Sequence, residues 1–357
     1  FLIRFMTSHP RDASKKLFDT MAKYDKIAKQ LHLPFQSGSS RVLKAMNRHY
    51  DREKYLETVN YAKSVMPDLV LTSDVIVGFP GETTEEFEDT LKVLVLGHSL
   101  AVDTGHMLNL VAHAEGYESL KLGTLYYSGC PLSKYYTDWV NGTAAYQFYE
   151  TTGEKRTSYA GSKTLEWCLA QGDWDVISMQ SRGALVMRDY LKGVDHLEAE
   201  DIKEATEVLF PYIREQFPNA KLYWHQTWAY QQDSTHSSFP NYGKSQEKMY
   251  NMIIDCVKEW IQPETRFDLI IPCMTSIQNA RTSFMGDTLT RDGYHMNYNI
   301  GRYIVGLTWY ASLTNAPIEG ITYNPSTTQI TADMMKAAKE AVTAAIKTPL
   351  TVTKSAI

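Results

Sequence analysis

The chain has 357 residues, of which 43% are hydrophobic and 22% are charged, and its formal net charge is −5. This composition is ordinary for a globular protein, the length allows two domains, and the acidic balance gives no basic field for nucleic acid or an anionic membrane. Every apolar run is shorter than the ~18 residues that a transmembrane helix needs, so no membrane span is expected. The chain begins at Phe1 rather than Met, so we expect that it is truncated and that any signal peptide is lost.

The composition changes near residue 91, because all seven tryptophans and all four cysteines lie after it. We therefore predict two domains, residues 1–91 and residues 92–357. In the first, apolar runs predict strands over residues 2–6, 30–36 and 69–80. Helical spacing predicts helices over residues 12–24, 40–47, 51–65 and 83–91. Three strands are too few to close a barrel.

Three stretches of the first domain carry a family pattern. They are TSHP at residues 7–10, LHLPFQSGSSRVLKAMNRHY at 31–50 and SDVIVGFPGETTEEFEDTL at 73–91. They resemble the middle of a radical-SAM tRNA methylthiotransferase. The resemblance implies part of a (β/α) barrel whose strand ends, around residues 36–39 and 74–81, would lie near bound S-adenosylmethionine. The CxxxCxxC motif that holds the reducing cluster is absent, so we expect this fragment to be non-catalytic and to bind no nucleic acid.

The two domains join abruptly at residues 91–92, with no Gly, Pro or Ser linker between them. Independent domains usually meet at an exposed polar segment. The join therefore favours a fusion or an assembly artefact of two unrelated reading frames over a genuine bifunctional protein.

The second domain alternates strand and helix patterns, which predicts a three-layer α/β/α fold with a doubly wound parallel sheet. Strands are expected over residues 92–97, 119–127, 174–180, 220–228 and 267–273. Helices are expected over residues 102–116, 162–172, 197–217, 245–261 and 303–313. Residues 131–162 are expected to form a loop-rich insertion. The four cysteines, Cys130, Cys168, Cys256 and Cys273, have no metal-site spacing, so we expect buried thiols, or one or two disulfides in an exported chain.

The strand over residues 92–97 ends at a glycine, so Ser99 is expected at the carboxyl edge of the sheet, where ligands bind in such folds. This is a position for a nucleophile, although a serine that only caps the next helix fits the same pattern. Much later, Asp292 and His295 lie three residues apart in a polar loop. A serine hydroxyl needs a base, and the base needs a third group to orient it, so these three residues form a candidate triad.

Residues 92–347 resemble the SGNH/GDSL hydrolase superfamily, whose fold is flavodoxin-like. GHS at residues 97–99, YYSGCPL at 126–132, WDVISMQ at 174–180 and the DxxH motif carry the resemblance. It implies Ser99 as nucleophile and an oxyanion hole made by the N–H groups of Ser99 and Gly129 and the side-chain amide of Gln180. His98 stands where Asp or Asn is usual, and Gln180 replaces the usual, shorter Asn. These two departures affect the oxyanion geometry.

The loop after the strand over residues 220–228 carries aromatic and polar side chains suited to a carbohydrate or another polar ester. We expect His98, Trp228, Tyr230 and His236 to line a substrate pocket. A metal site made by His225, Asp233 and His236 is an alternative use of this loop, although the spacing fits no recognised ligand pattern. His98 is an alternative base to His295. Arg182 and Arg188 are candidates to hold a substrate carboxylate, and His106 and His113 are expected to be structural.

The sequence therefore predicts a serine esterase that cleaves an acylated carbohydrate or another small polar ester through an acyl-enzyme, with no metal ion or organic cofactor. One alternative is a fragment of a radical-SAM tRNA methylthiotransferase. Another is a non-catalytic carbohydrate-binding protein on the same fold. The hydrolase part is compatible with export, whereas the first domain implies the cytoplasm.

Overall fold

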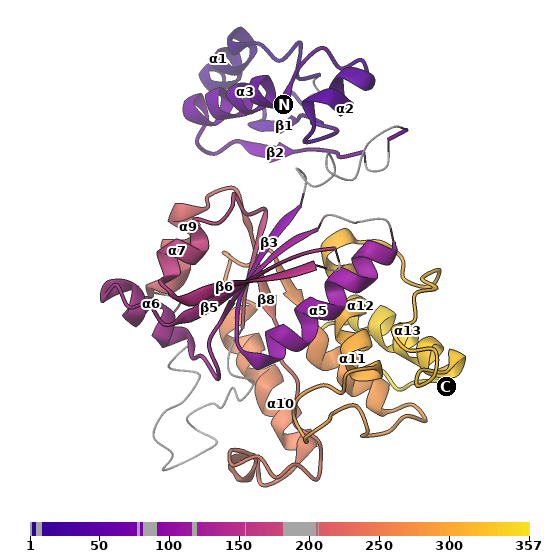
Figure 1. The fold of residues 1–357 in the computed structure, drawn as a ribbon. Coiled ribbons are helices and arrows are strands. Elements are labelled where there is room, and N and C mark those ends of the chain that lie inside the picture. The colour runs from indigo at the N-terminus through magenta and orange to yellow at the C-terminus, as the bar shows by residue number, and fades with distance from the viewer. Residues whose placement is uncertain are drawn as a thin grey trace. The chain divides into compact units, whose positions relative to one another are not determined.

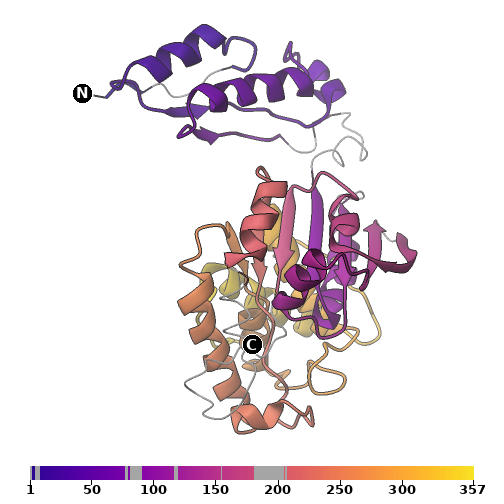
Figure 2. The ribbon, with the colours of Figure 1, turned by 90° about the vertical axis from the view of Figure 1, so that its left-hand side faces the viewer.

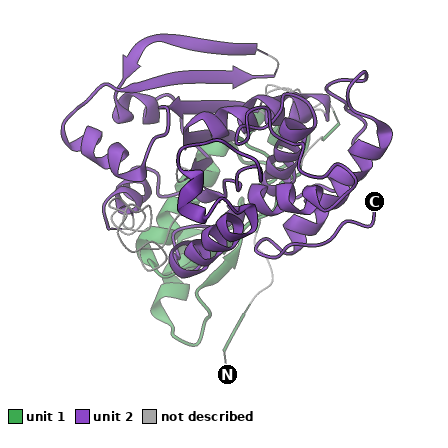
Figure 3. Cartoon of the chain, turned by 90° about the horizontal axis from the view of Figure 1, so that it is seen from below, with its two compact units in different colours: residues 1–91 green, residues 92–357 purple. Residues whose placement is uncertain are grey.

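The structure is a computed structural model, and it describes residues 2–4, 9–76, 79–80, 91–115, 120–153, 155–180, 205 and 207–357. The chain divides into two compact units, residues 1–91 and residues 92–357, which are coloured separately in Figure 3. The division falls where the composition of the sequence changes.

The described part of the first unit contains helices α1 (Lys15–Lys23), α2 (Ser40–Ala45) and α3 (Arg52–Val65) (Figure 1). Each begins after a polar residue whose side chain accepts a hydrogen bond from a backbone N–H three residues later. These residues are Ser14, Ser39 and Asp51. The helices predicted here are confirmed, and the one predicted from residue 83 lies in the stretch 81–90, outside the described residues.

The strands of the first unit are shorter than the sequence suggests. β1 (Gln30–His32) pairs in parallel with β2 (Val70–Thr72), and isolated bridges join Ile3 to Ile27 and Gln36 to Val75. A small core that includes Phe18 packs between the helices and this sheet. Within the described residues the sheet has two strands, so the barrel is incomplete, as predicted.

The second unit contains a seven-stranded sheet among its described residues. Its strands are β3 (Lys92–Gly97), β4 (Lys121–Tyr126), β5 (Tyr146–Thr152), β6 (Lys155–Lys163), β7 (Val176–Met179), β8 (Lys221–His225) and β9 (Leu269–Ile271). They lie in the order β6-β5-β4-β3-β7-β8-β9, in which β4, β3, β7, β8 and β9 are parallel and β5 and β6 are antiparallel. The parallel part has the flavodoxin-like strand order, so the predicted fold class is confirmed.

Helices lie on both sides of these strands (Figures 1 and 2). They are α5 (Ser99–Ala114), α6 (Leu132–Val140), α7 (Leu165–Leu169), α9 (Leu209–Gln216), α10 (Gln246–Cys256), α11 (Cys273–Arg281), α12 (Ile300–Thr314) and α13 (Ala332–Lys347). Helix α12 packs against α5, α11 and α13. Of the helix predicted over residues 197–217, the described part is mainly α9. None of the described helices has the length and apolar character needed to cross a membrane.

Residues 131–162 are not the loop-rich insertion that the sequence suggests. They hold α6 and nearly all of the β5–β6 hairpin, which extends the sheet beyond β4. Tyr146 and Phe148 are fully buried whereas Gln147 between them is exposed, so the aromatic run has the two-residue period of a strand with one covered face. Tyr135 of α6 stacks on Tyr146, with ring centroids 5.4 Å apart.

Strand β3 lies at the centre of the parallel sheet and is buried on both faces. Val93, Leu94, Val95 and Leu96 are at most 2% exposed. Burying each of these side chains contributes about 1.5–3 kcal/mol, which fixes the strand and the turn that follows it. Since the neighbouring strands β4, β7 and β8 run in the same direction, the residues that follow all four strands meet at one edge.

Candidate active site

Ser99 lies at this edge as the first residue of helix α5. The helix begins three residues earlier than the sequence suggests, because the His98 ring caps it: His98 Nδ1 accepts a hydrogen bond from the Leu100 N–H at 3.4 Å. The helix N-terminus carries a partial positive charge, which suits a group on which negative charge develops. Ser99 is partly exposed, whereas His98 is buried. The structure therefore uses His98 as a cap rather than as an exposed pocket wall.

Asp292 and His295 form a hydrogen-bonded pair within one loop. His295 Nδ1 lies 2.6 Å from Asp292 Oδ2, and Asp292 Oδ1 accepts from the backbone N–H groups of His295 and Tyr294 at 2.8 and 3.2 Å. An ionised carboxylate only accepts hydrogen bonds, so the proton of this contact belongs to Nδ1. The Nε2 atom of a neutral His295 is then left as a proton acceptor, which is the arrangement a general base needs.

A buried carboxylate on α5 holds the loop that carries this pair. Asp103 is 1% exposed; it accepts from Arg291 Nη1 at 3.0 Å, from Arg302 Nη2 at 2.6 Å and from the Met296 N–H at 3.0 Å. Arg291 directly precedes Asp292, and Met296 directly follows His295. Both ends of the DxxH motif are thus attached to Asp103.

Asp103 follows Ser99 by four residues on the same helix. Residues four apart lie on one helix face, so the loop is docked on the face of α5 that also carries Ser99. This contact brings the Asp292–His295 pair toward the nucleophile candidate. No hydrogen bond of Ser99 Oγ is found within the described part of the chain, and such contacts are often long before substrate binds. The Ser99–His295 pairing stays a prediction.

The two further oxyanion candidates, Gly129 and Gln180, follow β4 and β7, the two strands that pair with β3. Gly129 comes three residues after β4, in an exposed turn with φ +58°, a backbone conformation that favours glycine. Gln180 directly follows β7 and is 1% exposed. A methyl group on Gly97 would come within 3.1 Å of Gln180 Nε2, so this amide lies against the backbone two residues before Ser99.

The predicted pocket residues Trp228, Tyr230 and His236 gather around Tyr294. Trp228 Nε1 donates to the Tyr294 carbonyl oxygen at 2.7 Å, and the Tyr230 and His236 rings lie 5.8 and 4.7 Å from the Tyr294 ring. The Tyr294 ring in turn lies 4.1 Å from that of His295. Trp228 and Tyr230 are buried and His236 is half-buried, so the first two support the loop from within.

Sequence reasoning missed Asp103, Arg291 and Arg302. An acidic residue in an otherwise apolar helix, four positions after the candidate nucleophile, is the signal that could have found the first of them. The proposed roles of Arg182 and Arg188 fall outside the described residues. Among the described residues, no three His, Cys, Asp or Glu side chains form a group that fits a metal ion.

The Asp292 carboxyl gives the site a testable pH dependence. Burial by itself would raise its pKa, but the hydrogen bonds from the His295 ring and from two backbone N–H groups outweigh burial and lower the pKa. A carboxyl with a lowered folded pKa stabilises the fold above its unfolded pKa of about 3.9, and this contribution is lost as the pH falls through the folded value. We expect the difference in unfolding free energy between the parent and Asp292→Asn to shrink as the pH falls from about 4 through the folded pKa. Urea denaturation over this range measures it, and a difference that grows on acidification would contradict the assignment.

Comparison with family models matches residues 92–345 to DUF4886, described as a domain of unknown function, and residues 1–94 to the radical SAM superfamily. The second match confirms the resemblance predicted for the first unit. Among curated proteins, tRNA-2-methylthio-N(6)-dimethylallyladenosine synthases from Clostridium botulinum and Clostridium perfringens are 55% identical over 92 residues and 58% identical over 91 residues. Each match covers 26% of this chain and 20% of the relative, so the chain spans about a fifth of the length of these enzymes.

Among solved structures, a DUF4886 family protein from Bacteroides uniformis is 35% identical, with a TM-score of 0.66, over 74% of this chain and 97% of that chain. A putative SGNH hydrolase from Slackia heliotrinireducens is 16% identical, with a TM-score of 0.41, over 62% of this chain and 98% of that chain. The second likeness is too distant to carry an argument about the site.

Proposed function

The chain belongs to the DUF4886 family, which its residues 92–345 match, and from the geometry of its site we propose that the second unit is a serine hydrolase that cleaves esters through an acyl-enzyme. The observation that carries the proposal is the attachment of both ends of the DxxH motif to Asp103, one helical turn after Ser99. This attachment supports a triad of Ser99, His295 and Asp292.

In the proposed reaction, Ser99 Oγ attacks the ester carbonyl carbon while His295 Nε2 takes the hydroxyl proton. Asp292 accepts the hydrogen bond from Nδ1 and stabilises the imidazolium. The alcohol leaves with the proton from His295, and water then attacks the acyl group by the same route in reverse. The opposing candidate for the base is His98, but its ring is buried and its Nδ1 caps α5, which favours His295.

The negative charge on the carbonyl oxygen needs donors that are already in place. The N–H groups of Ser99 and Gly129 and the amide of Gln180 are the proposed donors. In serine hydrolases, one side-chain donor of this kind is worth about two to three orders of magnitude in kcat.

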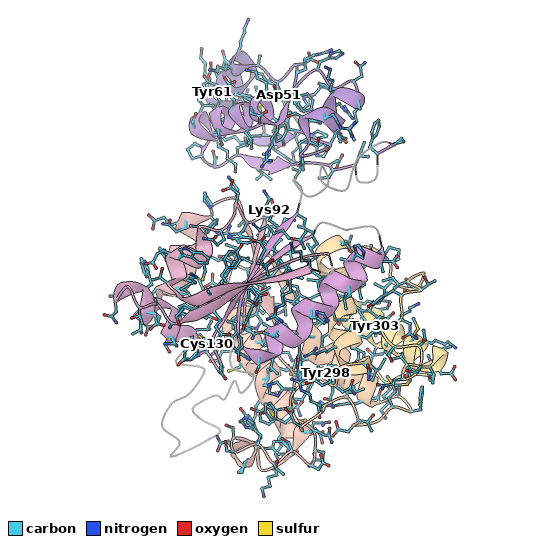
Figure 4. The ribbon with its side chains drawn as sticks, viewed as in Figure 1. Asp51, Tyr61, Lys92, Cys130, Tyr298 and Tyr303 are labelled. Atoms are coloured by element: carbon cyan, nitrogen blue, oxygen red, sulfur yellow. The ribbon has the colours of Figure 1, made fainter. Side chains whose placement is uncertain are left out.

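We propose an acylated carbohydrate or another small polar ester as the substrate. The aromatic groups beside His295 support this class, because aromatic rings present apolar faces to sugars and polar atoms to their hydroxyls. Tyr298 adds to them: it is 61% exposed, three residues after His295, and Figure 4 shows it on the side of the unit that carries α11 and α12. Its ring is held by the guanidinium groups of Arg291 and Arg302, which lie 4.9 and 4.6 Å from the ring centre.

A fluorophosphonate tests the proposed nucleophile. Ser99 Oγ should attack phosphorus, form an oxygen–phosphorus bond and release fluoride, while His295 takes the proton. We expect one adduct per chain, located on Ser99 by peptide mass spectrometry, and no adduct with Ser99→Ala. An adduct on another serine, or an unmodified folded parent, would overturn the proposal and favour a carbohydrate-binding protein without catalysis.

A further inference from the structure

Four buried polar side chains with unused hydrogen-bonding capacity lie in or directly after β7 and β8. They are Ser178, Gln180, His225 and Gln226, each at most 1% exposed. Among the described residues, the hydroxyl of Ser178, both amide atoms of Gln180 and Gln226 and both ring nitrogens of His225 have no hydrogen-bond partner. An unpaired buried polar group costs about 1–3 kcal/mol, so native proteins rarely keep several together without a purpose.

Gln180 and His225 are neighbours in the sheet. β7 and β8 pair in parallel with Met179 beside Trp224, so the next residues, Gln180 and His225, lie side by side at the carboxyl edge. Neighbours in register share a face of the sheet. The approach of the Gln180 amide to Gly97 identifies this face as the α5 side, since a methyl group on Gly97 would also lie 2.4 Å from Ala101 Cβ.

The His225 ring is fixed in place and neutral. It meets the Trp309 ring edge-on at 5.3 Å and lies 6.3 Å from the Trp228 ring. Burial, together with the neighbouring His98, lowers the pKa of His225 to about 3. A neutral imidazole offers one N–H donor and one acceptor nitrogen.

An amide beside an oxyanion works in only one orientation, with the NH2 group toward the developing charge and the carbonyl oxygen away from it. In Gln180 neither end is held by a partner among the described residues, so a donor near the carbonyl end is needed to fix this orientation. Ser178 and Gln226 also have unused donors, but His225 is the residue in register with Gln180 on the neighbouring strand.

We propose that His225 is a positioning residue: its ring N–H, unpaired among the described residues, pairs with the carbonyl oxygen of Gln180 when the amide turns its NH2 group toward the oxyanion formed at Ser99, and so holds the amide in that orientation. Gln226, next to His225, belongs to the same network. The inference rests on the proposed hydrolase function, and it adds a residue that acts through Gln180 without touching the substrate.

The test compares kcat and KM for a short-chain chromogenic acetate ester in His225→Phe, His225→Asn, His225→Gln and Gln180→Leu. Phenylalanine keeps a ring against Trp309 but has no donor, whereas the Asn and Gln amides place an N–H near the position of one or the other ring nitrogen. We expect His225→Phe to lower kcat about 10- to 100-fold with KM changed less than about threefold. One of the two amide variants should recover most of the loss, and His225→Phe should add nothing in the Gln180→Leu background.

The possible results distinguish a failure of the positioning role of His225 from a failure of the proposed hydrolase function. If the parent is active and His225→Phe matches it while Gln180→Leu is slow, the positioning role is overturned and the hydrolase stands. If all three His225 variants lose activity equally and melt at lower temperature, the ring is structural and the inference fails. If the folded parent shows no turnover that depends on Ser99, the proposed function fails and the inference fails with it.

Discussion

Replacing Asp103 with asparagine is expected to destabilise the second unit and to remove most of the proposed esterase activity. The carboxylate is 1% exposed and binds Arg291, Arg302 and the Met296 N–H, whereas asparagine has no charge and a single acceptor oxygen. Removing one partner of a buried ion pair costs about 3–5 kcal/mol. The two arginine side chains keep 25% and 16% of their exposure, so we expect the lower end of this range.

Urea denaturation measures the stability loss, and ester turnover at a temperature where both proteins are folded measures the activity loss. We expect kcat to fall at least about 10-fold, because the loop with Asp292 and His295 is no longer held on α5. Asp173→Asn is the matched control, since Asp173 is exposed in the same unit and its replacement should change stability by less than about 0.5 kcal/mol. An Asp103→Asn variant that is as stable and active as this control would contradict the proposal that Asp103 holds the loop with Asp292 and His295 on α5.

The second large effect is expected from the triad itself. In comparable triads, loss of the nucleophile or of the base lowers kcat by about six orders of magnitude, and loss of both costs little more. We therefore expect Ser99→Ala and His295→Ala each to lower kcat by at least about 10⁴-fold, and the double variant to be no slower than either single one. Without a base the hydroxyl is not activated, and without the hydroxyl the base has nothing to act on.

His113→Gln is the control for this series, because His113 lies near the far end of the helix that begins at Ser99. It should turn over ester at the parent rate. Additive losses in the double variant would mean that Ser99 and His295 act independently, and the triad would then be wrong.

The parts of the site that could be predicted from the sequence are those encoded by residues close together in the chain. Four adjacent apolar residues identify β3, the glycine after them identifies the turn to Ser99, and the spacing of Asp292 and His295 allows their hydrogen bond. Each of these patterns fits in a few residues. The fold class follows in the same way, from the alternation of short apolar runs with amphipathic segments.

The contacts that assemble the site could not be predicted in this way, because they join residues far apart in the chain. Asp103 is separated from Arg291 by 188 residues and from Arg302 by 199. Nothing in the local sequence of either partner specifies the other. The same limit applies to Trp228, whose aromatic ring suggested a pocket wall but whose N–H supports the backbone of Tyr294 from a buried position.

The hairpin of β5 and β6 was not predicted from the sequence, for a different reason. Its residues combine aromatic, charged and glycine positions, and only Tyr146 and Phe148 of the first strand show the alternation expected of a half-buried strand. Antiparallel strands with one solvated face carry a weaker hydrophobic pattern than a central strand that is buried on both faces.

The most direct measurement of the central claim, that Ser99 is a nucleophile activated by His295, is hydrolysis of a short-chain chromogenic acetate ester at neutral pH by the full chain beside Ser99→Ala. We expect clear turnover by the parent and a rate near the uncatalysed background for Ser99→Ala, with both proteins folded. A folded parent that does not hydrolyse the ester, or a Ser99→Ala variant that keeps the parent rate, would contradict it.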